Sequence, residues 1–165
     1  MATGKGAPGK PWAGSPGAET EAIRGTHMDI DFKTKISRLN PKQRTWFATA
    51  IVAIVLADGN IDRAEVDFIV KLVSLVPDQP TVERLKKFIQ FKTIPPLGAP
   101  AEIDRKLAMS MMIDMVRVAV SDKHFPDSEK VMLMKVGKSL GFSEGEVEKL
   151  ILYGFELMAQ SAKSA

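Results

Sequence analysis

The chain has 165 residues, which favours a single domain, and 45% of them are hydrophobic, enough for a core and too many for a disordered protein. It contains no cysteine, so disulfides, thiolate nucleophiles, zinc–thiolate sites and iron–sulfur clusters are excluded. The formal charge is only +3 and falls to about +2 without residues 1–27, so it gives little support to binding of nucleic acid or an anionic membrane.

Residues 1–27 consist largely of Gly, Pro, Ala and Ser and cannot bury enough apolar surface to fold. We interpret them as a disordered tail or as a segment derived from an expression vector, because His27-Met28 suggests a natural start at Met28. The predicted domain therefore comprises residues 28–165. The tail lacks the apolar central region of a secretory signal, so we expect a cytoplasmic protein.

From Met28 onward the sequence predicts an all-α fold, a bundle of about seven helices. Asn40 and Pro41 are typical of a helix cap and a first helical residue. The following apolar run is about half the length of a membrane span, so we expect a buried core helix. The predicted helices are, in chain order, residues 29–39, 41–57, 62–76, 81–92, 101–120, 127–140 and 144–162.

Three further signals define helix ends in this prediction. Asp62 and Glu65 are spaced as a capping box at the start of one helix, and Ser143 and Glu146 are spaced in the same way at the start of the last. Gly141 is typical of a left-handed residue that ends the helix before it. The helix over 101–120 is apolar nearly all round in its second half, which indicates a central, buried position.

Two acidic loops repeat within this arrangement. The sequence LADGNIDRAE at residues 56–65 returns in altered form as VSDKHFPDSE at residues 120–129, 64 positions later. In each copy an Asp ends an apolar stretch and a Glu follows seven residues later. The sequence therefore predicts an internal pseudo-repeat of helix, acidic loop and helix.

The repeated loops carry the oxygen ligands that a hard divalent cation prefers. The candidate metal ligands are Asp58, Asn60, Asp62 and Glu65 in the first loop and Asp122, His124, Asp127 and Glu129 in the second. The pattern is not that of an EF-hand, because the sixth position from Asp58 is Arg63 and the acidic residue falls at the eighth position rather than the twelfth. Helix capping is the alternative explanation of the same carboxylates.

The motif ADGNIDRAE at residues 57–65, its altered copy SDKHFPDSE at 121–129 and the segment LGFSEGE at 140–146 resemble the TerB-like, tellurite-resistance family. The resemblance covers about residues 41–153. It implies an all-helical fold with an internal pseudo-repeat, and acidic residues that handle metal in bacterial stress-response or metal-resistance systems. Related domains occur in membrane-linked co-chaperones, so a metal-free protein-interaction module is the alternative. The second copy departs from the motif, with Lys123 in place of Gly and Phe125 in place of Ile.

Other sequence features give little support to an enzyme. His124 is the one imidazole outside the tail, and neither a Gly-rich phosphate loop after a strand nor an HExxH motif is present. We therefore expect a non-enzymatic domain with a divalent cation, or with a protein partner in a bacterial stress or membrane-associated complex. We expect neither nucleic-acid binding nor a membrane span.

Methionine is abundant, with nine residues in the chain. We expect most of them to fill the core, although flexible methionine side chains also suit an adaptable binding groove. The methionines concerned lie in two of the predicted helices, at Met109, Met111, Met112, Met115, Met132 and Met134.

Overall fold

A computed structural model of the chain describes residues 22–23, 30–100, 102–121 and 125–164. Six α-helices make up nearly all of the regular structure in these ranges, as the sequence predicted for an all-α fold. They are α1 (Pro41–Leu56), α2 (Arg63–Val73), α3 (Gln79–Gln90), α4 (Arg105–Val120), α5 (Asp127–Ser139) and α6 (Glu144–Ser164).

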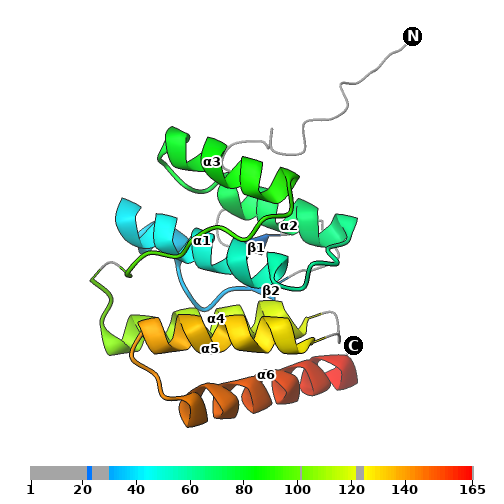
Figure 1. Cartoon of the computed structure of the whole chain (residues 1–165). Coiled ribbons are helices and arrows are strands. Elements are labelled where there is room, and N and C mark those ends of the chain that lie inside the picture. Colours follow the sequence, from blue (N-terminus) through cyan, green and yellow to red (C-terminus); the bar gives the residue numbers. More distant parts are fainter. Residues whose placement is uncertain (1–21, 24–29, 101, 122–124, 165) are drawn as a thin grey trace.

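The helices are stacked in layers (Figure 1). Helix α1 lies at the centre and contacts α2, α3, α4 and α5, whereas α6 packs on α4 and α5 at the opposite end of the stack from α3. Every residue of α1 from Trp46 to Leu56 is buried, which confirms the prediction of a core helix. The one hydroxyl in this stretch, Thr49 Oγ1, donates to the carbonyl of Thr45 at 2.8 Å, so it costs little to bury.

The predicted helix starts are confirmed where a side chain caps them. Asn40 caps α1, Asp62 caps α2 and Ser143 accepts from the backbone N–H of Glu146 at 3.1 Å. Asp104 caps α4, so this helix begins four residues later than predicted. Gly141 has φ +91°, the left-handed conformation expected after a helix end.

The prediction of a helix over residues 29–39 is wrong for most of its length. Only η2 (Ile36–Arg38) forms a short 3-10 helix, and strand β2 (Ile30–Asp31) pairs antiparallel with β1 (Ala22–Ile23). Strand β1 belongs to the segment that we assigned to the tail, and it contacts α2. The domain boundary at residue 28 stays a prediction.

Asp114 explains why this segment is not helical. Its fully buried carboxylate accepts hydrogen bonds from the backbone N–H groups of Lys33 and Thr34, both at 2.7 Å. These N–H groups therefore bond to a side chain of α4 and not to the carbonyl groups of a local helix. Burial is the largest influence on the pKa of Asp114 and raises it, whereas these hydrogen bonds and the charge of Arg117 oppose the rise.

Two glycines let α6 lie close to its neighbours. A Cβ atom on Gly137 of α5 would come within 2.5 Å of Val147, and one on Gly154 of α6 would come within 2.5 Å of Val116 in α4. At these two positions the helices therefore lie closer together than a residue larger than glycine would allow. Within the described ranges no helix combines the length and the apolar character needed to cross a membrane.

Candidate metal centre

The first acidic loop is shaped by a glycine and closed by a capping box. Gly59 has φ +76°, a left-handed conformation that turns the chain after α1, and its N–H donates to the carbonyl of Leu56 at 3.1 Å. Asp62 Oδ1 accepts the N–H of Glu65 at 2.8 Å, and Glu65 Oε2 accepts the N–H of Asp62 at 2.9 Å. Glu65 is thereby held at the third position of α2, where it is only 5% exposed.

The second loop is built differently where it meets α5. Pro126 precedes the first residue of α5, Asp127, and provides no side-chain cap. Glu129 holds the third position of α5, the same place that Glu65 holds in α2, and is 4% exposed. Both helix starts therefore bury a glutamate.

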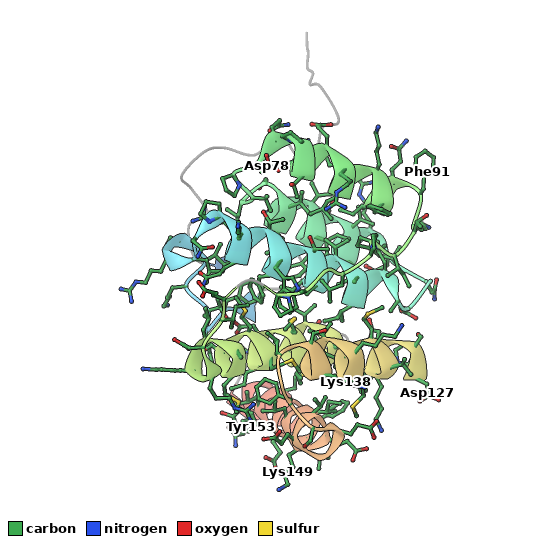
Figure 2. The ribbon with its side chains drawn as sticks, turned by 60° about the vertical axis from the view of Figure 1, so that its left-hand side comes forward. Asp78, Phe91, Asp127, Lys138, Lys149 and Tyr153 are labelled. Carbon is green, nitrogen blue, oxygen red and sulfur yellow. The ribbon has the colours of Figure 1, made fainter. Side chains whose placement is uncertain are left out.

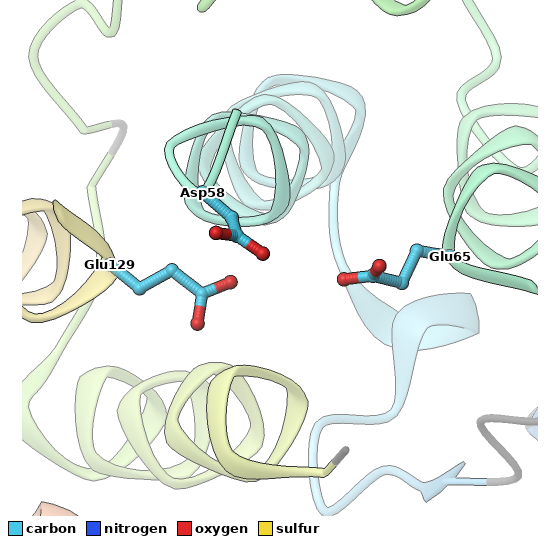
Figure 3. Close-up of side chains that lie close together, drawn as sticks. All are labelled: Asp58, Glu65 and Glu129. Carbon is cyan, nitrogen blue, oxygen red and sulfur yellow. The ribbon is translucent and has the colours of Figure 1, made fainter. Parts of the chain in front are cut away.

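Three carboxylates from these two helix starts come together (Figure 3). One oxygen each of Asp58, Glu65 and Glu129 lies within 4.8 Å of the other two, and the side chains point toward one another. Asp58 is half-buried at the end of α1, and the two glutamates are buried. The end of one helix and the starts of two others thus enclose the group.

The spacing of these oxygens is within the reach of one cation. Oxygen ligands lie about 2.0–2.6 Å from Mg²⁺ or Ca²⁺, so two ligands on opposite sides of the ion are separated by roughly 4–5 Å. A hard divalent ion would neutralise much of the negative charge of three carboxylates, which otherwise repel one another. The partly buried group of Asp58, Glu65 and Glu129 could hold a metal.

The other predicted ligands have different positions. Asp62 is exposed and caps α2, while Asn60 and Asp127 are exposed. Asp62 and Asp127 are not part of the acidic group. Asp122 and His124 lie outside the described residues, so their role as ligands stays a prediction.

Comparison with protein-family models, with curated proteins and with solved structures finds no match to this chain. The acidic group and the surfaces around it are therefore the features that indicate a function.

Proposed function

We propose that the chain is a non-enzymatic, TerB-like domain of stress-response or tellurite-resistance type, with an internal pseudo-repeat, that binds a divalent cation through Asp58, Glu65 and Glu129. The observation that carries the proposal is the convergence of these three carboxylates, two of them buried, within 4.8 Å of one another. The two glutamates come from equivalent places in the two copies of the acidic loop.

Helix capping accounts for one of these glutamates and not for the other. Glu65 completes the capping box with Asp62. Glu129 cannot form the same bond, because residue 126 is proline and proline has no backbone N–H. Reciprocal capping therefore does not explain the buried position of Glu129, and this position suits a cation ligand beside Asp58 and Glu65.

The ligand set favours a hard cation. All three ligands are carboxylates, which suit Mg²⁺, Ca²⁺ and Mn²⁺, and the chain has no cysteine to favour a soft metal. The carboxylate of Glu65 accepts the capping hydrogen bond and also belongs to the acidic group. The capping bond therefore fixes its orientation before a cation binds.

Calorimetry and thermal unfolding with Mg²⁺, Ca²⁺, Mn²⁺ and Zn²⁺ test the proposal. Added cation should raise the unfolding temperature of the wild type relative to protein in chelator, and an excess of about 100 times Kd should stabilise it by about 2.7 kcal/mol. The double variant Asp58→Asn with Glu129→Gln should lose this response, because two of the three charges are gone.

Asp127→Asn is the matched control, since Asp127 lies in the same turn of α5 as Glu129 but is exposed and outside the group. It should keep the response of the wild type. Equal unfolding temperatures for the wild type in chelator and in millimolar cation, with no heat of binding, would disprove cation binding.

A metal-free interaction module of co-chaperone type is the second candidate function. The observation that favours it is the number of large apolar side chains at the surface, among them Phe91 at 70%, Leu152 at 65% and Val131 at 56% exposed. Apolar surface of this kind is typical of a contact with another protein. Failure of the cation experiment would leave this function as the better proposal.

A further inference from the structure

We propose that the exposed side of the C-terminal half of α5 is a docking surface for an acidic, apolar-rich segment of another protein. The surface consists of two grooves that share Lys135 and Lys138, and we call it the α5 surface. It differs from the acidic group in its exposure, because Glu129 is buried whereas Val131, Lys135 and Lys138 are exposed. Figure 2 shows Lys138 far from Asp127, which begins the helix.

The first groove lies between α5 and the loop before α4. It has a volume of about 610 Å³, and its apolar lining comes from Ile94, Pro95, Pro96, Leu97 and Met132. The two prolines fix their own φ angles, so this wall is stiff and already formed. Ile94 is 42% exposed and available to a ligand.

The second groove lies between α5 and the turn into α6. It has a volume of about 470 Å³, with Val131, Met134 and Phe142 as its apolar lining. Val131 is 56% exposed, and Met134 is partly buried. One flexible methionine in each groove, Met132 or Met134, can adjust its shape to different apolar side chains.

The positive charge of the two lysines between the grooves favours an acidic partner. Lys135 and Lys138 are exposed and three residues apart, so they are neighbours on the helix surface. Other basic residues nearby are paired between helices: Lys130 with Glu148 at 3.4 Å and Arg105 with Glu146 at 2.7 Å. Among the described residues no ion pair joins Lys135 or Lys138.

A partner with the complementary pattern has carboxylates that meet the two lysines and apolar side chains on either side of them. The apolar side chains would enter the two grooves, one on each side of α5. One carboxylate, Glu144, lines the second groove and lowers its positive charge, so the acidic residues of the partner belong nearer the first groove. The preformed walls favour binding because little order is lost on association.

The direct test uses the full chain and a fluorescein-labelled synthetic peptide in which a run of glutamates is flanked by pairs of leucines. Fluorescence anisotropy should show saturable binding that weakens as salt is added, because the exposed charges are screened. Peptides with lysine in place of glutamate, or with serine in place of leucine, should bind at least about tenfold more weakly.

Variants of the protein locate the binding surface. Lys135→Glu with Lys138→Glu should weaken binding of the acidic peptide by about tenfold or more. The control Lys106→Glu with Lys149→Glu makes the same change of net charge at exposed positions on α4 and α6 and should change binding less than twofold. Ile94→Ser and Val131→Ser each remove an exposed apolar group from one groove, and both should weaken binding without affecting unfolding.

Three results would overturn the proposal. One is equal loss of binding in the two double variants, which would mean that net charge alone attracts the peptide. Another is preference for phosphatidylserine vesicles over the peptide through the same lysines, which would make the surface a membrane contact. The third is a dimer in sedimentation that Lys135→Glu with Lys138→Glu dissolves, which would make a second copy of the chain the occupant.

Discussion

Glu65 and Glu129 hold the same position in α2 and α5, and both are buried, yet they are held in different ways. In the pair α1 and α2 the glutamate closes a capping box, whereas in the pair α4 and α5 a proline removes the N–H that such a box requires. A glutamate at this position can have two roles, as a capping partner and as a member of the acidic group, and the two loops separate these roles. The capping box accounts for the position of Glu65, whereas the position of Glu129 suits the proposed cation site.

The helix pairs α1–α2 and α4–α5 differ also in their packing, and substitutions in their cores should have the largest effect on stability. The separation of 64 residues relates Phe68 in α2 to Met132 in α5. Phe68 is fully buried, and its ring lies 6.2 Å from that of Phe32, whereas Met132 is partly buried beside a groove. Phe68→Ala should lower the free energy of unfolding by about 3–5 kcal/mol.

Met132→Ala should cost clearly less, because part of that side chain is already in contact with water. Denaturant unfolding of the two variants measures the difference. Equal losses would show that these two side chains contribute equally to the core.

Asp114 in α4 corresponds by the same separation to Ala50 in α1, so at this position a buried carboxylate is found in α4 and not in α1. Lys33 and Thr34 donate to different oxygens of Asp114, and asparagine would place an NH2 donor where one of these oxygens stands, so one N–H group would face a donor. Asp114→Asn should therefore lower the free energy of unfolding by about 1–3 kcal/mol.

The same variant gives a pH test. Because burial raises the pKa of Asp114 in the folded protein above its ordinary value of 3.8, the folded state holds the proton more tightly than the unfolded state. The stability that this carboxyl contributes is complete below pH 3.8 and is lost as the pH rises through the raised pKa. The advantage of wild type over Asp114→Asn should thus shrink as the pH rises, and a growing advantage would contradict the raised pKa.

The close approach of α6 to α4 predicts a smaller loss of stability. Gly154→Ala places a methyl group 2.5 Å from the stiff side chain of Val116, which should cost about 1–2 kcal/mol after the gain in helix propensity. Gly145→Ala is the control, since the side chain nearest to an added methyl group, Ser143, lies 4.0 Å away, and it should stabilise the protein slightly. Thermal unfolding of both variants in parallel gives the comparison.

The smallest expected effect on stability comes from substitutions at the N-termini of α2 and α5. Asp62→Ala removes the cap of α2 and should cost about 1 kcal/mol in chelator. Asp127→Ala changes a first-turn carboxylate of α5 that makes no cap, so its loss should be a few tenths of a kcal/mol. Equal losses in denaturant unfolding would mean that the two helix starts are alike after all.

Local sequence signals predicted the helices well because caps and apolar periods act over a few residues. Asn40, Asp62 and Ser143 identify their helix starts, and Gly141 identifies an end. The capping box of Asn40 with Gln43 and the caps at Asp78 and Asp104 follow the same rule and could have been recognised.

Features that depend on distant contacts were not predicted. The hydrogen bonds that keep residues 33 and 34 out of a helix come from Asp114, 80 or more residues away in the chain. The candidate ligands in the first loop could be proposed from spacing, but only the packing of α2, α5 and the end of α1 distinguishes Glu65, which joins the group, from exposed Asp62.

The bonds from Lys33 and Thr34 to Asp114 also tie the segment before α1 to the core. A truncation that starts at Asn40 would retain every α-helix but leave a carboxylate in the core with neither backbone donor. An independently stable fragment should therefore include residues 30–39, which lie before the first α-helix, and limited proteolysis should spare them. A boundary drawn from the helices alone would remove part of the core.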